Sequence, residues 1–309
     1  MKPYPRTIPS LFEGKCRYQI PLFQRQYVWT RERQWVPLWE DIESKTSAQA
    51  PRPGSRLRPH FLGTIVWKPE IQYGEEVPVR AVIDGQQRLT TFQILLAAMR
   101  DVGAALSIAK YSTELETYTK NTGEMSRKDV ECYKVWPTEG DAEVFTCVMS
   151  AKAKAEVERQ FPLVLVRRKP QLRHGIVEAY LYFYDAIAEY LTSEGSDATA
   201  RFSDLFRTLT QQIQLVSLEL EEQDDPQVIF ETLNARGEPL LASDLLRNFI
   251  FVRADRGGED YKTLYATYWK SFDTAKAFEE TTTVGAVSEE ALRRAEQAKR
   301  DAKFFWKIP

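Results

Sequence analysis

Apolar positions in the first third of the chain follow strand-like patterns and then a helical one. Residues 18–23, 61–67 and 79–83 are short runs rich in β-branched and aromatic side chains, which favour strands. From residue 86 to residue 102, apolar side chains recur at helical spacing. Together these segments predict a compact mixed α/β unit.

Another helix is predicted near residue 30. Trp35, Leu38, Trp39 and Ile42 follow the i, i+3, i+4, i+7 spacing that places side chains on one helix face. Thr30 precedes this run and is a residue type that caps helices. Pro37 should bend the helix, because proline has no backbone amide hydrogen to donate within it.

The later sequence predicts a helical part and then a second strand-to-helix unit. Residues 176–187 carry apolar side chains at helical spacing, whereas residues 213–220 resemble a strand. Pro226 fits the first position of a helix that follows this strand. We therefore expect an α+β protein composed of a core at 1–105, a helical insertion or subdomain at 106–210, a distal strand–helix unit completing the core at 211–272, and a linker with a charged C-terminal helix at 273–309.

Composition adds limits on the class of protein. The chain has 309 residues and a net charge of −2, and it contains no run of about 18 apolar residues. Its first residues lack the apolar region of a secretory signal, so we expect a cytoplasmic protein without a membrane segment. Three cysteines without a CxxC spacing and two histidines give no support to a disulfide framework or a zinc site.

The most informative feature is the run from Asp84 to Arg88, which reads as a strand end, a tight turn and a helix start. Gly85 can adopt the positive φ that such a turn often needs, and the first amides of a helix favour an anion. Arg88 is a permanently charged donor for phosphate oxygens, and Gln86 and Gln87 can both donate and accept hydrogen bonds. The run favours phosphate chemistry. The alternative is a buried polar cluster in which Arg88 pairs with a carboxylate and Asp84 caps the helix.

Positive charge is concentrated in two segments. Residues 1–70 contain 12 Lys and Arg against 6 Asp and Glu, and residues 151–175 contain 7 against 2. Basic loops at about 51–60 and 167–174 suit a phosphate backbone, although ordinary solvated loops have the same composition.

Four blocks of the chain, in this order, resemble the N-terminal domain of the GmrSD-type restriction family, which belongs to the ParB/sulfiredoxin-like superfamily. The blocks are residues 20–29, 60–66, 84–88 with the sequence DGQQR, and 230–240 followed by 244–248. The resemblance implies a ParB/sulfiredoxin-like mixed α/β core with a largely helical second part.

The resemblance also implies hydrolysis of a nucleoside triphosphate (NTP), coupled to restriction of modified DNA, such as phosphorothioate DNA, or of foreign DNA. On this comparison, Arg88 holds phosphate, Gln86 and Gln87 orient phosphate oxygens or the attacking water, and Asp84 binds Mg²⁺ or accepts a proton. The implied nucleotide-binding residues are Gly85, Gln24, Arg25, Asn234 and Arg236. The residues that we expect to contact DNA are Tyr27, Arg52, Arg56, Arg58, Arg167, Arg168 and Lys169.

In this family the nuclease is usually an HNH-type domain, which needs histidines near a metal. No histidine follows His174, so we expect the nuclease to be a separate domain or subunit and this chain alone not to cut DNA. No GxxxxGK[ST] sequence occurs, which argues against a P-loop mechanism. A ParB-like DNA-binding module without hydrolysis and a nuclease that uses Asp84 stay open as alternatives. The sequence also leaves open which NTP is used, which DNA modification is recognised, and whether the protein forms oligomers.

Overall fold

The computed structural model describes most of the first 221 residues and parts of the remainder. The described residues are 2–22, 24–47, 59–70, 77–166, 169–171, 173–193, 195, 197–221, 223–226, 228–229, 232, 247, 250–251, 253–254 and 257–270. The chain divides into two compact units, Met1–Asp244 and Leu245–Pro309.

The first unit is built around a mixed six-stranded sheet. In spatial order its strands are β1 (Lys2–Thr7), β8 (Ile213–Glu219), β3 (His60–Glu70), β4 (Val79–Asp84), β2 (Arg17–Gln19) and β5 (Val135–Trp136). The β1/β8 and β3/β4 pairs are antiparallel, whereas β3/β8, β2/β4 and β2/β5 are parallel. Because β8 lies between β1 and β3, the strand of the expected distal unit is part of this sheet.

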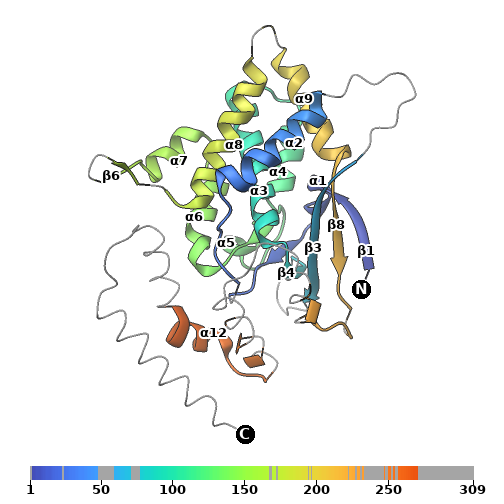
Figure 1. Ribbon diagram of the computed structural model, residues 1–309, viewed down its shortest axis with the longest axis vertical. Helices are drawn as coiled ribbons and strands as arrows, with labels where there is room; N and C mark the ends of the chain where they lie inside the picture. The colour runs from blue at the N-terminus through green and yellow to red at the C-terminus, as the bar shows by residue number, and fades with distance from the viewer. Residues whose placement is uncertain are drawn as a thin grey trace. The chain divides into compact units, whose positions relative to one another are not determined.

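Helices cover the sheet and form most of the rest of the unit (Figure 1). The described helices of this unit are α1 (Ile8–Leu11), the π-helical turn η1 (Arg31–Trp35), α2 (Val36–Ser47), α3 (Gln86–Ala105), α4 (Ser112–Thr119), α5 (Lys128–Glu131), α6 (Glu139–Ser150), α7 (Lys154–Gln160), α8 (Gly175–Thr192) and α9 (Ala198–Gln211). A separate two-stranded ribbon pairs β6 (Leu165–Val166) with β7 (Lys169–Pro170).

The central helix is α3, in which every residue from Leu89 to Gly103 is buried. A helix buried on all sides must be covered by other elements, and α3 contacts α4, α6, α8 and the strands β3 and β5. Its first turn follows directly from the end of β4. The β4–α3 connection is therefore held between the sheet and the helical core.

The predicted α+β architecture is confirmed. The strand predicted at 79–83 and the helix predicted from Gln86 are both present, as β4 and α3. Pro37, where a bend was expected, is the second residue of α2, which follows the π-helical turn directly at Val36. The strand predicted at 18–23 is shorter, because β2 ends at Gln19 and Pro21 offers no amide to continue a ladder. The edge strand β1 was not predicted.

The second unit is described only in part. It contains α12 (Tyr261–Leu264) and the π-helical turn η2 (Tyr265–Trp269), and Asp260 caps α12 by accepting from the amides of Lys262 and Thr263. The ring of Phe251 packs edge-on against Tyr265 and Trp269. The charged helix expected at the C-terminus lies outside the described residues. Where helices are described, none has both the length and the apolar character needed to cross a membrane.

Candidate functional site: the β4–α3 turn

The turn between β4 and α3 has a backbone that requires glycine. Gly85 is the N-cap of α3 and has φ 93° and ψ 13°, the left-handed region. A Cβ atom at this position would lie 2.6 Å from Cγ2 of Ile65 in β3. Gly85 thus allows β4 to turn into α3 against the neighbouring strand.

The first turn of α3 leaves backbone amides open. No side chain caps the helix, and the first intrahelical bond of the turn joins the Leu89 amide to the Gly85 carbonyl at 3.0 Å. The preceding amides, together with the helix dipole, favour a negatively charged group at this end. The backbone is therefore suited to an anion.

Arg88 lies across this opening. Its Nη1 donates to the Thr64 carbonyl oxygen at 3.0 Å and lies 3.8 Å from Oδ2 of Asp84. Gly63, with φ 103°, makes room for this guanidinium, since a Cβ atom there would lie 3.1 Å from Arg88 Nε. The pairing of Arg88 with a carboxylate, expected for a buried polar cluster, is thus present. Yet the side chain of Arg88 is 32% exposed and that of Asp84 24%.

Asp84 is the single carboxylate of the DGQQR run. Burial raises the pKa of its carboxyl above the ordinary value, while the charges of Arg88 and Arg25 and a hydrogen bond from the Gly85 amide oppose this rise. Two arginines face one aspartate, which leaves the turn with an excess of positive charge.

Two glutamines attach the segment after β2 to this turn. Gln24 is 8% exposed, and its Nε2 donates to the carbonyls of Val82 at 2.8 Å and Ile83 at 3.2 Å. Gln87 donates to the Gln26 carbonyl at 3.0 Å and accepts from the Val28 amide at 2.9 Å. Both ends of the Gln87 amide are therefore used to hold the backbone of residues 26–28 beside α3.

Tyr27, which we expected to contact DNA, lies in the core at 7% exposure. Its hydroxyl is within 2.7 Å of Thr91 Oγ1 and accepts from Trp35 Nε1 at 2.9 Å. Its ring stacks on Trp35 at an interplanar angle of 8°. From this position the ring offers little surface to DNA, and its evident role is to fix the 26–28 segment.

Asp141 is a buried anchor that is not among the site residues expected from the sequence. Its Oδ2 accepts from the Tyr27 amide and from Thr138 Oγ1, both at 2.9 Å, and its Oδ1 lies 3.2 Å from Nε2 of His174. His174 in turn caps α8 by accepting from the Ile176 amide. Thr138 and Asp141 match the [ST]xx[DE] pattern of a helix start, a local signal that could have drawn attention to Asp141.

The remaining expected residues are placed as follows. Arg25 and Gln86 are half-buried, and neither side chain has a hydrogen-bond partner within the described part of the chain. Lys169 lies in β7, but its side chain is not described. The residues outside the described part are Asn234, Arg236, Arg52, Arg56, Arg58, Arg167 and Arg168.

The donors at the turn allow one type of metal binding and disfavour another. Within the described ranges, no three His, Cys, Asp or Glu side chains gather in a way that could hold a metal. Mg²⁺, however, is commonly held by one or two carboxylates together with water and substrate phosphates. Asp84 fits this second arrangement.

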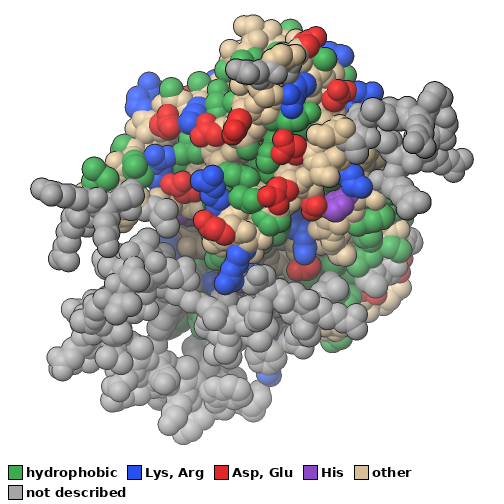
Figure 2. Space-filling view, turned by 45° about the horizontal axis from the view of Figure 1, so that its top comes forward, with side chains coloured by type: hydrophobic (Ala, Val, Ile, Leu, Met, Phe, Trp, Pro, Cys, Tyr) green, Lys and Arg blue, Asp and Glu red, His purple; other side chains and the backbone are tan. Residues whose placement is uncertain are grey.

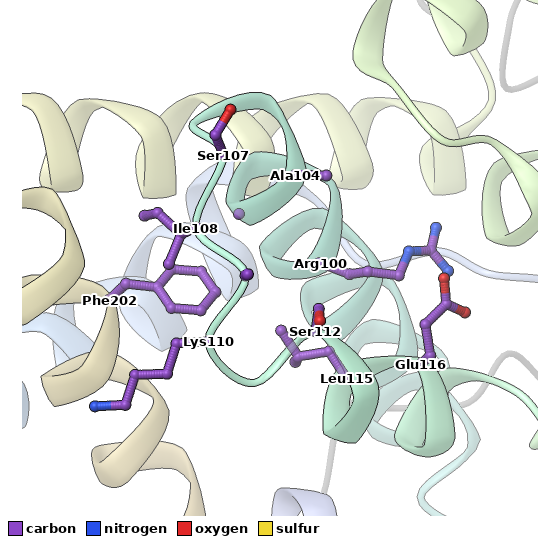
Figure 3. Close-up of a pocket in the computed structure, with 11 residues that line it drawn as sticks. Arg100, Ala104, Ser107, Ile108, Lys110, Ser112, Leu115, Glu116 and Phe202 are labelled. Atoms are coloured by element: carbon purple, nitrogen blue, oxygen red, sulfur yellow. The ribbon is translucent and has the colours of Figure 1, made fainter.

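A cavity of about 250 Å³ lies elsewhere, between α3, α4 and α9 (Figure 3). Phe202, Ile108 and Leu115 give it apolar walls, and Arg100 and Glu116 point toward one another at one side. Arg100 is committed to the protein, because it donates to Asp101 and to the carbonyls of Met149 and Ala151. Lys110, Ser107 and Ser112 also line the cavity, but it lies apart from the DGQQR run and contains none of the expected nucleotide-binding residues.

The helical face in Figure 2 carries acidic and basic side chains intermixed. Such a surface gives no extended field of one sign, which a DNA-binding face would need. Most of the residues expected to contact DNA lie outside the described part of the chain. The mixed charge of this face therefore does not test whether those residues bind DNA.

The turn, its two arginines and the residues that support them belong to a segment with known relatives. The model of the family described as "GmrSD restriction endonuclease, N-terminal domain" matches residues 8–251, well over half of the chain. No individual curated protein matches the sequence. The match includes β4, the DGQQR turn and α3, together with Gln24, Tyr27 and Asp141. The chain therefore belongs to the GmrSD restriction endonuclease family, whose N-terminal domain it carries.

Proposed function

We propose that the β4–α3 turn binds the phosphates of a nucleoside triphosphate and promotes its hydrolysis, as part of a restriction system. The observation that carries this proposal is the open helix start behind Gly85, with Arg88 and Arg25 beside it. Phosphoryl transfer depends mainly on positioned charge, which this arrangement supplies.

Arg88 has the central role in the proposal. Its Nη1 is held by the Thr64 carbonyl, while Nε and Nη2 have no partner among the described residues. A forked donor that is anchored at one nitrogen can present the others to phosphate oxygens with little loss of side-chain freedom. Arg25 would supply a second charge, and Asn234 and Arg236 would close the nucleotide site from the distal part of the chain.

The two glutamines of the turn then have different roles. Gln86, whose amide is uncommitted in the described structure, would orient the attacking water. Gln87 would act as a positioning residue, since its amide holds the 26–28 backbone. Asp84 would accept a proton from that water, a role favoured by its raised pKa, or would hold Mg²⁺. When bound, Mg²⁺ supplies positive charge to the β- and γ-phosphate oxygens.

We further propose that DNA binding changes nucleotide turnover in this cytoplasmic module, which thereby controls an HNH-type nuclease domain or subunit in antiviral defence. Membership of a restriction endonuclease family supports a role in restriction and a nuclease partner. Modified DNA, such as phosphorothioate DNA, is the proposed signal, and the basic segments near residues 52–58 and 167–169 are the proposed contacts. Any such coupling must be reciprocal in affinity, so nucleotide must alter DNA binding by the same factor.

Two observations favour a second candidate, a ParB-like module that binds DNA and nucleotide without hydrolysis. Gln87 is fully occupied by backbone groups, and Asp84 lies within 3.8 Å of Arg88, so fewer groups are free to activate water. In this case nucleotide would act as an effector only.

The two candidates are separated by measuring binding and turnover on the same protein. The purified chain is mixed with Mg²⁺ and GTP, ATP, UTP or CTP, with and without modified DNA, and released phosphate and bound nucleotide are followed in parallel. Hydrolysis that Arg88→Ala removes supports the NTPase. Binding without phosphate release supports the second candidate. If the protein neither binds nor hydrolyses nucleotide, both candidates are contradicted. Arg159→Ala, at an exposed arginine in α7, is the matched control.

A further inference from the structure

A second cavity lies on the sheet, at a distance from the β4–α3 turn. It has a volume of about 260 Å³, and five strands contribute to its lining, with Tyr4 and Arg6 from β1, Ser217 from β8, Trp67 from β3, Arg80 from β4 and Tyr18 from β2. The first three of these strands lie side by side (Figure 1). Arg80 precedes Asp84 by four strand residues, about 13 Å along β4, so an occupant of this sheet-face pocket would not be the phosphate group at the turn.

Hydrogen bonds and ring contacts hold together the inner wall of the sheet-face pocket. Trp67 Nε1 donates to Ser217 Oγ at 2.9 Å, and the Tyr18 hydroxyl accepts from Arg80 Nη1 at 2.8 Å. The Arg80 guanidinium carbon lies 4.8 Å from the ring centre of Trp67 and 5.1 Å from that of Tyr18. The Arg80 guanidinium is thus preorganised between two aromatic rings before any ligand binds.

Two cations of this pocket keep donors available. Arg80 uses Nη1 for Tyr18 and the Leu11 carbonyl, while its Nε and Nη2 have no partner in the described structure. Arg6 has neither a hydrogen bond nor an ion pair there, and its guanidinium lies 5.8 Å from the ring of Tyr4. Glu13 is the one acidic side chain of the lining, and the nearby carboxylate of Glu219 also acts on the charge of Arg80, so the two arginines offer directed donors rather than a net excess of charge.

The outer wall offers an aromatic surface. The Tyr4 side chain is 40% exposed at the edge strand, next to Arg6. Exposed aromatic rings beside arginines are the elements that bind nucleotide units of single strands, through stacking of the base and contact with the phosphate. A volume of about 260 Å³ is below the roughly 300–1,000 Å³ of ordinary ligand pockets, so a complete nucleoside triphosphate would not be enclosed.

We propose that the sheet-face pocket binds one nucleotide unit, with the base stacked on Tyr4 and the phosphate between Arg6 and Arg80. The unit belongs either to a single-stranded nucleic acid or to a free mononucleotide. The proposal does not rest on NTP hydrolysis at the β4–α3 turn.

The test is a binding experiment on the full chain in the Arg88→Ala background, which removes the proposed phosphate contact at the turn. A fluorescently labelled thymidine pentanucleotide is the probe, and its anisotropy is followed. Thymidine monophosphate and inorganic phosphate are the competitors. Tyr4→Ala should weaken binding roughly 5- to 150-fold, the range expected when a stacking partner of one base is lost. Tyr4→Phe should retain affinity. Phe61→Ala, at an exposed aromatic of β3 outside the pocket, is the control.

Salt dependence tests the phosphate contact separately. Arg6→Gln should reduce the slope of log K against log salt by about 0.7, the value for one phosphate contact with a single strand. Competition by thymidine monophosphate at concentrations near those of the pentanucleotide would assign the site to free mononucleotides, and weak competition would assign it to a strand. The proposal is overturned if inorganic phosphate competes as well as the mononucleotide, if Tyr4→Ala binds like the parent, or if no binding occurs.

Discussion

Replacing Arg88 with alanine separates a phosphate-binding role from a purely structural one. The substitution removes a charged hydrogen bond to the Thr64 carbonyl at 3.0 Å and an ion pair with Asp84 at 3.8 Å. A hydrogen bond from a charged donor typically contributes about 1.5–3 kcal/mol, and a partly exposed ion pair up to about 1 kcal/mol. Since Arg88 is 32% exposed, water can replace part of both contacts, and we expect the free energy of unfolding to fall by about 1–2 kcal/mol.

The expected effect on turnover is larger. Loss of one preorganised donor to a developing charge typically lowers the rate about 10²- to 10³-fold, so phosphate release should fall by that factor. Arg88→Lys retains the charge but not the forked geometry, and an intermediate rate is expected. The parent and both variants are compared by phosphate release and by urea denaturation. The phosphate role is refuted if folded Arg88→Ala hydrolyses at the parental rate. Loss of the fold would instead favour the buried polar cluster.

Three further predictions concern the turn and the basic loops. Gly85→Ala should lower the free energy of unfolding by about 1–3 kcal/mol because of its positive φ and the contact with Ile65, more than Gly14→Ala, where φ is also positive but nothing lies within 4 Å. An equal loss in both variants would exclude the Ile65 contact as a cause. Burial raises the pKa of Asp84 above its ordinary value of 3.8, so near this pKa the folded state binds more protons than the unfolded state. The free energy of unfolding therefore falls as the pH rises from the ordinary pKa through the raised one. Asp84→Asn should therefore gain stability relative to the parent between pH 3 and pH 7, and a difference independent of pH in urea denaturation would contradict this sign. Replacing Arg52, Arg56 and Arg58 together should reduce the slope of log K against log salt for duplex DNA binding by up to about three units. An unchanged slope would mean that these three arginines are ordinary loop residues.

Much of the β4–α3 connection could be predicted because its determinants are local. Strand-forming residues, a glycine and a helical apolar pattern follow one another within about 25 residues, and each restricts the backbone by itself. The chemistry of Arg88 at a helix start follows from the same short segment. The position of Arg88 over Gly63 and the Thr64 carbonyl depends on β3 and could not be read from this segment.

Interactions between distant segments escaped prediction for the same reason. The side-chain amide of Gln87 binds the backbone of Val28 and of Gln26, which lie 59 and 61 positions earlier in the chain. Asp141 accepts from the Tyr27 amide, 114 positions earlier. No spacing rule connects such residues. Tyr27 was therefore expected at a DNA surface, although its hydroxyl and ring are held in the core.

The edge strand β1 illustrates a local pattern that tertiary structure overrides. Pro3 and Pro5 argue against a strand, because neither can donate to a ladder. At the edge of the sheet only one side of the strand is paired, and β1 runs antiparallel to β8 from the Lys2–Glu219 pair to the Thr7–Gln214 pair. Prolines are tolerated there, and they hinder pairing with further chains.

The most direct test of the proposed nucleotide site is an experimental structure of the protein with Mg²⁺ and a non-hydrolysable NTP analogue, chosen by the phosphate-release assay or, if nothing is hydrolysed, by binding. We expect phosphate oxygens within about 3 Å of the free Arg88 nitrogens and of the first amides of α3, with the metal near Asp84. Phosphates bound elsewhere, with Arg88 still engaged only with Thr64 and Asp84, would contradict the account.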